Sequence, residues 1–124
     1  MIKNYTSIEQ SKKLAEIPPI ESADMLYYCS KESNTLISES PFTRSFKETN
    51  TFSYVLCWSL AALLSVLPYN YIDDNDTVCH PNLIKTKDGR YMVIYNVSQY
   101  TSLCNNPVDA CVEMIIHLNE LKML

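Results

Sequence analysis

The sequence predicts an α+β fold in which a small antiparallel sheet packs against a central helix and a C-terminal helix. Three features support it: an apolar run at 52–68, a turn signal at 87–90 between two strand-like runs, and an Asn-Pro pair at 106–107 that opens an amphipathic stretch. Strands and helices do not alternate in the repeated order that indicates a parallel sheet. At 124 residues, the chain is expected to form a single domain over 1–124.

The central apolar run divides into a strand and a helix. Phe52 to Trp58 is aromatic, β-branched or apolar without a helical polar stripe, which is typical of a strand. Ser59 is expected to cap the following helix, which is rich in Ala and Leu and ends at Pro68. Because the run is shorter than the ~18 residues that a bilayer requires, we expect no membrane span.

A β-hairpin is predicted at 83–95, with strands at Leu83–Thr86 and Tyr91–Tyr95. The residues between them contain Asp88-Gly89, the pair preferred in a two-residue type I′ turn. This register places Ile84, Thr86, Tyr91, Val93 and Tyr95 on one face and Leu83, Lys85, Met92 and Ile94 on the other. Neither face is clearly polar, so we expect the second face to be partly covered.

The last helix is predicted to start after Asn106 as N-cap, with Pro107 in its first turn, and to run close to Lys122. Its expected buried stripe is Val108, Cys111, Val112, Ile115 and Leu118, and its polar stripe is Asp109, Glu113, His117 and Glu120. Further apolar residues lie beyond that stripe: Ala110, Met114, Ile116, Leu121, Met123 and Leu124. We expect a homodimer through this end, the alternatives being cover by the 30–50 segment or by the central helix.

The first part of the chain contains weaker signals. Thr6 and Glu9 form a capping-box pattern for a short helix over Ser7–Glu16, and Met25–Cys29 suits a first strand. Residues 30–50 are mostly polar and are expected to be a mobile segment, part of which could form a short helix or an outer strand.

Composition excludes several function classes. The net charge is −4 and the ten basic residues are scattered, so direct nucleic-acid binding is not expected. Gly89 is the only glycine, which excludes P-loops, dinucleotide-binding fingerprints and nucleophile elbows in their usual forms. The five cysteines are odd in number and form no C-x-x-C pair, and no secretory signal opens the chain, so we expect free thiols in the cytoplasm.

Few residues suggest chemistry, and no cofactor or metal is predicted. Cys79 and His80, with Cys104 or Cys111 brought near by folding, could supply a thiolate or a zinc site, but two buried thiols beside a loop histidine explain the same residues. Glu113 and His117 share a helix face, which permits metal ligation but is more often a solvated stripe. The acidic loop 73–76 is not an EF-hand, because glycine and glutamate are absent at its sixth and twelfth positions.

Aromatic residues suggest a binding surface. Five of them could form an exposed patch that anchors a protein partner: Trp58, Tyr69, Tyr71, Tyr91 and Tyr95. For Trp58 core packing is the stronger expectation, since it lies inside the apolar run.

Three segments resemble a known family: Ser22-Ala23-Asp24-Met25, Cys57-Trp58-Ser59-Leu60 with its Ala/Leu run, and Asn106-Pro107-Val108-Asp109-Ala110. They are similar to segments of small uncharacterised proteins encoded in prophages and other mobile elements of gut bacteria. That family often has glycine in place of Ala61 and proline in place of Leu56, so this chain departs from it where the central helix starts. The resemblance implies a genetic context and no reaction.

Two functions of different class remain. We favour a non-enzymatic, protein-binding accessory factor of a phage or mobile element, because the chain has nine tyrosines and no catalytic motif. The alternative is a small cysteine-dependent or metal-dependent hydrolase that uses Cys79, His80 or His117.

Overall fold

The computed structural model describes residues 3–17, 22–30, 34–37 and 52–124. Its helices are α1 (Ile8–Leu14), α2 (Leu60–Val66) and α3 (Pro107–Glu120). Its strands are β1 (Met25–Ser30), β2 (Asn34–Ile37), β3 (Phe52–Cys57), β4 (Tyr71–Ile72), β5 (Val78–Cys79), β6 (Asn82–Lys85), β7 (Tyr91–Asn96) and β8 (Gln99–Tyr100). The α+β prediction is confirmed.

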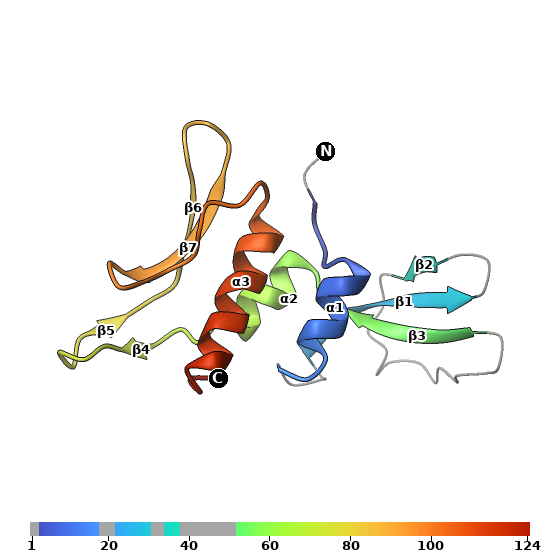
Figure 1. The fold of residues 1–124 in the computed structure, drawn as a ribbon, viewed down its shortest axis with the longest axis horizontal. Coiled ribbons are helices and arrows are strands. Elements are labelled where there is room, and N and C mark those ends of the chain that lie inside the picture. Colours follow the sequence, from blue (N-terminus) through green and yellow to red (C-terminus); the bar gives the residue numbers. More distant parts are fainter. Residues whose placement is uncertain (1–2, 18–21, 31–33, 38–51) are drawn as a thin grey trace.

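Helix α3 runs through the middle of the molecule with α2 beside it, while β4–β8 lie on one side and α1 with β1–β3 on the other (Figure 1). Within the described ranges, the strands form three antiparallel sheets in the orders β2–β1–β3, β4–β5 and β6–β7–β8. Strand β2 lies inside the predicted mobile segment 30–50, of which 31–33 and 38–50 lie outside the described residues. No helix in the described part of the chain is long and apolar enough to cross a membrane.

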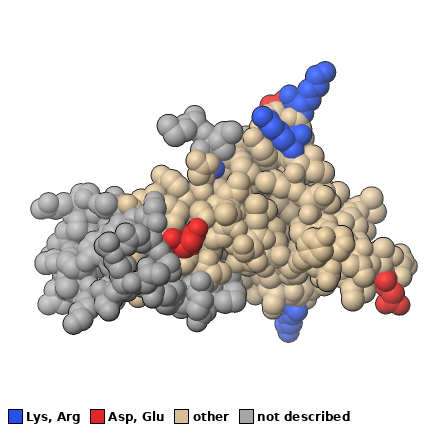
Figure 2. Space-filling model, turned by 180° about the vertical axis from the view of Figure 1, so that it is seen from behind, with Lys and Arg blue, Asp and Glu red and all other residues tan. Residues whose placement is uncertain are grey.

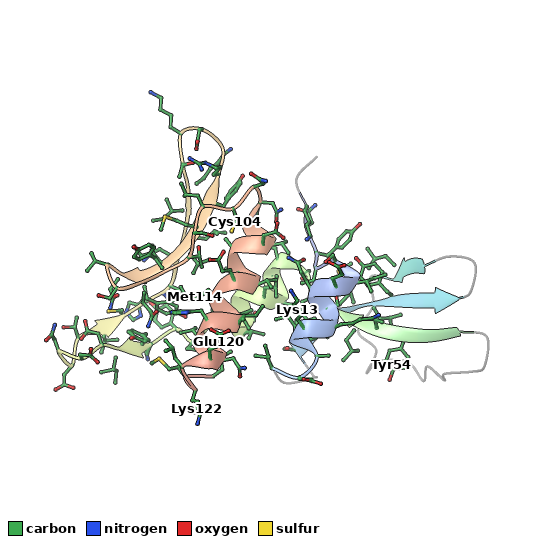
Figure 3. All side chains as sticks on the ribbon, in the orientation of Figure 1. Lys13, Tyr54, Cys104, Met114, Glu120 and Lys122 are labelled. Atoms are coloured by element: carbon green, nitrogen blue, oxygen red, sulfur yellow. The ribbon has the colours of Figure 1, made fainter. Side chains whose placement is uncertain are left out.

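The hydrophobic core lies where α2, α3 and β7 meet. Trp58, Leu63 and Val93 are fully buried there, and each such side chain contributes about 1.5–3 kcal/mol by leaving water. The predicted buried stripe of α3 is confirmed, because each of its members is buried. Ala110 and Met114, from beyond that stripe, are also buried within this chain; Met114 lies midway along α3 (Figure 3).

The predicted caps of α2 and α3 are confirmed. The Ser59 side chain accepts a hydrogen bond from Ala62 N (3.2 Å), and Asn106 Oδ1 accepts from Asp109 N (2.8 Å) with Pro107 following in the first turn. Helix α3 ends at Glu120, two residues before the predicted end, because Lys122 adopts a left-handed conformation (φ 58°). Met123 N then donates to Leu118 O (2.9 Å), which closes the helix in a Schellman motif.

The cap of α1 differs from the prediction. Ser7, not Thr6, is the N-cap, and it forms a reciprocal capping box with Gln10 rather than with Glu9. Thr6 is fully buried instead, and its hydroxyl accepts a hydrogen bond from Trp58 N (3.1 Å). This long-range contact makes the Thr6 side chain unavailable to the helix, so the cap falls one residue later.

The β6–β7 hairpin has a different register from the predicted one. Its loop contains three residues, because Gly89 N donates to Thr86 O (3.0 Å) and Thr86 N donates to Arg90 O (2.7 Å). Gly89 has φ +84°, as in the three-residue loop formed by a type I turn and a left-handed residue. The extra loop residue shifts the pairing by one position, to Asn82 with Ile94, Leu83 with Val93, Ile84 with Met92, and Lys85 with Tyr91.

Hydrogen bonds join the segment before β1 to the turn between β3 and α2. Trp58 Nε1 donates to Ser22 Oγ (2.8 Å), and Ser59 N donates to Asp24 Oδ1 (2.8 Å) while the Ser59 hydroxyl also contacts this carboxylate. These bonds fix the turn from β3 into α2 against the start of β1. The side chains of Ser22, Asp24, Trp58 and Ser59 therefore stabilise the fold.

A polar contact also fixes the N-terminal segment to α3. Asp109 Oδ1 accepts hydrogen bonds from Lys3 Nζ (3.0 Å) and Gln10 Nε2 (2.7 Å). Burial raises the pKa of this carboxyl, but the hydrogen bonds from Gln10 and Lys3 outweigh burial and lower it below its ordinary value. The ionised carboxylate therefore stabilises the packing of α1 against α3.

Candidate functional site

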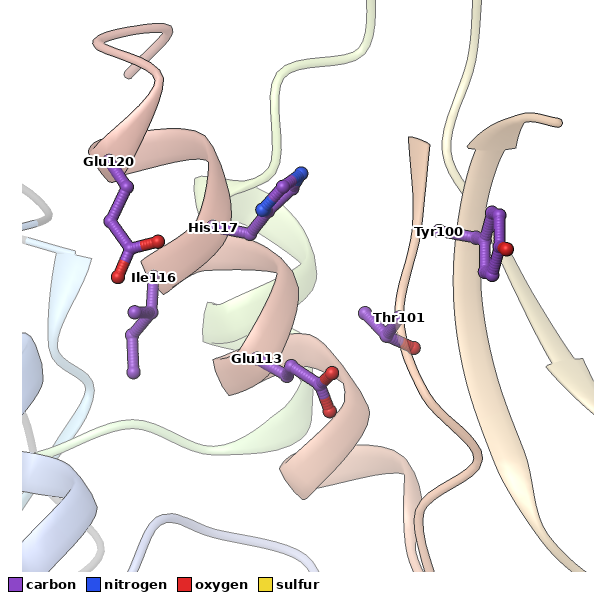
Figure 4. Close-up of a pocket in the computed structure, with 6 residues that line it drawn as sticks. All are labelled: Tyr100, Thr101, Glu113, Ile116, His117 and Glu120. Atoms are coloured by element: carbon purple, nitrogen blue, oxygen red, sulfur yellow. The ribbon is translucent and has the colours of Figure 1, made fainter. Parts of the chain in front are cut away.

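A shallow pocket lies between α3 and the segment that follows β8. Its volume is about 290 Å³, and it is lined by Tyr100, Thr101, Glu113, Ile116, His117 and Glu120. Glu113 and His117 project from α3 toward the strand segment that contains Thr101 (Figure 4). Both belong to the predicted polar stripe, so the sequence placed them correctly on one helix face.

Glu113 is engaged by the chain itself. Its carboxylate accepts hydrogen bonds from Ser102 N (3.0 Å) and Ser102 Oγ (2.8 Å), and Cys104 Sγ lies 3.3 Å from Oε2. Burial raises the pKa of Glu113, but the hydrogen bonds from Ser102 outweigh this and lower it below its ordinary value. The ionised Glu113 thus fastens the segment after β8 to α3.

Cys104 lies beside the first turn of α3 (Figure 3), and its thiol is held in the protonated form. Burial, followed by the hydrogen bond and negative charge of Glu113, raises its pKa to about 11. Because the thiolate is the nucleophilic form of cysteine, this environment opposes covalent catalysis by Cys104.

His117 is oriented by an amide. Its Nε2 hydrogen-bonds Gln99 Oε1, and Gln99 Nε2 donates to the Tyr71 hydroxyl (3.1 Å). Since the amide oxygen only accepts, this contact places a proton on His117 Nε2. The chain from His117 through Gln99 to Tyr71 holds α3 against β8 and β4.

The other predicted chemical residues lie elsewhere. Cys79 Sγ is 3.7 Å from Asn96 Nδ2, whereas the neighbouring His80 ring stacks on Tyr69 and its Nδ1 lies 2.8 Å from Tyr69 O. Within the described ranges, Cys79, His80 and His117 make no hydrogen bond with one another, and no three His, Cys, Asp or Glu side chains gather as a potential metal site. The two cysteines considered with them, Cys104 and Cys111, are free thiols in this structure.

The five aromatic residues proposed as a binding surface do not share one. Trp58 and Tyr95 are buried, and Tyr71 and Tyr91 are half-buried against the core. Only Tyr69, 68% exposed, remains largely in contact with water. Core packing of Trp58 and Tyr95 is the physical reason, since both belong to the buried hydrophobic core together with residues of α2 and α3.

An apolar surface that the sequence did not reveal lies on the outer face of the β6–β7–β8 sheet. Val93 is fully buried, so its side of the sheet faces the core, and its neighbours on β7 point the other way. Cross-strand pairing adds Ile84 and Asn82 from β6, opposite Met92 and Ile94, and Tyr100 from β8, also opposite Ile94. We use the term outer sheet face for the apolar residues on this side, Ile84, Met92, Ile94 and Tyr100, which border the exposed Asn82.

These four side chains are half-buried or exposed, with Ile84 at 41% and Tyr100 at 56%. A sheet with one face on the core normally has polar residues on the other, so four adjacent apolar side chains are unusual there. The sequence offered a signal, since Met92 and Ile94 were assigned to a face that is not clearly polar. The predicted turn, however, gave that face Leu83 and Lys85 in place of Ile84.

Charges of opposite sign lie at the two ends of this sheet. Lys87 and Arg90 lie at the tip of the β6–β7 hairpin, and Arg90 Nε contacts Asp88 Oδ2 at 2.8 Å. The turn between β4 and β5 contains Asp73, Asp74 and Asp76. Figure 2 shows blue side chains with a smaller red area at the hairpin tip (upper right) and red side chains at the β4–β5 end (lower right), with uncharged surface between the two ends.

The sequence and the structure were compared with protein-family models, curated proteins and solved structures, and none of them matches this chain.

Proposed function

We propose that this protein is a non-enzymatic accessory factor that works by binding another protein. The resemblance to proteins of prophages and mobile elements supports that setting for it. The four cysteines whose side chains are described are free thiols, which supports a reducing cytoplasm as its location.

The observation that supports protein binding is the outer sheet face. Contiguous exposed apolar side chains on a protein surface mark interaction sites, because leaving them in water costs about 25 cal/mol per Å². The four residues span three hydrogen-bonded strands, so they form one surface and not a set of isolated contacts. The free edge of β6, which pairs only with β7 among the described strands, lies next to it.

The groups considered for catalysis support this choice less well. The Glu113 carboxylate already accepts hydrogen bonds from Ser102 and Cys104. The raised pKa of Cys104 disfavours the thiolate that a nucleophilic cysteine requires. His117 is fixed by Gln99 in a structural chain of hydrogen bonds. We therefore do not propose a hydrolase.

Affinity purification from the native host tests the proposal. Tagged wild type is compared with an Ile84→Lys/Tyr100→Lys variant, and with Leu64→Lys as a control, since Leu64 is about as exposed as Ile84 but lies on α2. A protein retained by wild type and by the control, but lost from the double variant, is the expected result; an untagged second copy of the chain counts as such a protein. If the double variant retains every protein that wild type retains, the outer sheet face does not bind a partner.

A further inference from the structure

We infer that the occupant of the outer sheet face is a second copy of this chain, packed face to face about a two-fold axis. The inference rests on the proposed function and names the partner of that surface. It is drawn from the distribution of charge around the apolar residues.

The surface is complementary to itself. Its centre is apolar except for Asn82. The hairpin tip at one end of the sheet has a net positive charge, because Arg90 pairs with Asp88 while Lys87 has no such partner among the described residues. The other end of the sheet is acidic. The acidic end is located by Asp73 and Asp74, which line a small pocket together with Val97 and Ser98, the turn at the far end of β7. The six residues of β7 separate the two ends, which corresponds to roughly 20 Å along the strand.

A two-fold axis that lies in the interface and crosses the strands reverses the strand direction of one copy relative to the other. It places apolar centre on apolar centre, and each basic hairpin tip over the acidic turn of the other copy. Two such sheets pack with their strands within about 30° of each other, as sandwiched sheets do. Because the contact is isologous, each copy contributes one hairpin tip and one acidic turn. The dimer therefore contains two equivalent contacts between opposite charges.

The charged side chains that would set this arrangement can make contacts between the two copies. Lys87 and Asp74 are exposed and make no hydrogen bond or ion pair within the described residues. Asp73, in contrast, accepts hydrogen bonds from Asn75 N and Thr77 N (both 2.9 Å) and shapes the turn. Lys87 and Asp74 are thus the positions at which charge can be changed with little effect on the fold.

The dimer is expected to be weak. The outer sheet face measures roughly 14 by 20 Å, from three strands about 4.8 Å apart and six residues of about 3.4 Å each. This is less than the ~800 Å² per partner of a standard interface. Association is therefore expected in the micromolar range or weaker, and it must be measured at high protein concentration.

Sedimentation velocity of the full chain, from about 10 to about 500 µM, tests the inference. Wild type and Leu64→Lys should shift toward a dimer as concentration rises, while Ile84→Lys/Tyr100→Lys should remain monomeric. Circular dichroism and Trp58 fluorescence confirm that each variant is folded. If wild type remains a monomer over the whole concentration range, the proposed dimer is wrong. It is also wrong if Leu121→Lys/Leu124→Lys, at the C-terminal end, abolishes dimerisation while Ile84→Lys/Tyr100→Lys leaves it unchanged.

A charge exchange tests the direction of packing. Lys87→Glu alone and Asp74→Lys alone should each weaken the dimer about tenfold, because each creates two like-charge contacts. An equimolar mixture of these two variants should restore association, since every tip then meets a turn of opposite charge. If the mixture is as weak as either variant alone, the two-fold arrangement is wrong.

Failure of the dimer can be distinguished from failure of the proposed function. A monomeric wild type whose outer sheet face still captures a different host protein overturns the dimer and leaves the proposed function standing. A dimer with the expected charge dependence supports both.

Discussion

Replacing Asp24 with Ala is expected to loosen the start of α2. The Asp24 carboxylate accepts a hydrogen bond from Ser59 N at 2.8 Å and contacts the Ser59 hydroxyl, which in turn caps Ala62 N at 3.2 Å. One substitution therefore removes two bonds to a carboxylate and frees the capping hydroxyl to rotate.

The size of the effect follows from these contacts. A hydrogen bond to a charged group contributes about 1.5–3 kcal/mol, and the half-buried position of Asp24 places each bond at or below the lower end of that range. We expect Asp24→Ala to lower the free energy of unfolding by about 2–3 kcal/mol and the Tm by about 10 °C. Asp24→Asn, whose amide oxygen still accepts from Ser59 N, should lose about half as much.

Urea unfolding followed by fluorescence measures this loss, because Trp58 is the only tryptophan and is fully buried. A double-mutant cycle with Ser59→Ala should give a coupling of at least about 0.5 kcal/mol, since the two side chains interact directly. The reasoning is refuted if Asp24→Ala unfolds within about 0.5 kcal/mol of wild type, the range of an ordinary surface substitution.

Lys122→Gly should stabilise the protein by about 1 kcal/mol in the same assay, because a Cβ is unfavourable at φ 58°, and Lys122→Ala, which keeps the Cβ, should give no such gain. The folded-state pKa values of Asp109 and Glu113 are lowered, so their contribution to stability is present above the ordinary carboxyl pKa of about 4 and is lost as the pH falls through the lower folded values. In Asp109→Asn/Glu113→Gln, the Tm should therefore fall less steeply than in wild type as the pH is lowered below about 4. A pH dependence of the Tm identical to that of wild type would contradict the assigned hydrogen bonds. Cys104 should react with iodoacetamide more slowly than free cysteine at neutral pH, and Glu113→Gln should speed the reaction in peptide mass spectra; fast, selective labelling of wild-type Cys104 would contradict its raised pKa.

The candidate site was only partly predictable. The helical period placed Glu113 and His117 on one face, because spacing along a helix is set by the backbone alone. Their partners Ser102 and Gln99 come from another element, and no local pattern indicates that they meet α3. The outer sheet face was missed because Asp-Gly suits both two-residue and three-residue loops, and a change of one residue in the loop exchanges the cross-strand neighbours of every position.

By itself, the sequence determined the features that depend on a few neighbouring residues. Ser59 and Asn106 cap their helices, Pro107 starts α3, and the buried stripe follows the helical period, since each involves contacts within about four positions along the chain. Only the tertiary structure decided that Thr6 is buried against Trp58 and so cannot cap α1. It likewise decided the hairpin register, because burying Val93 in the core beside α3 selects the side of the sheet that faces the core and leaves the apolar side chains of the other face at the surface.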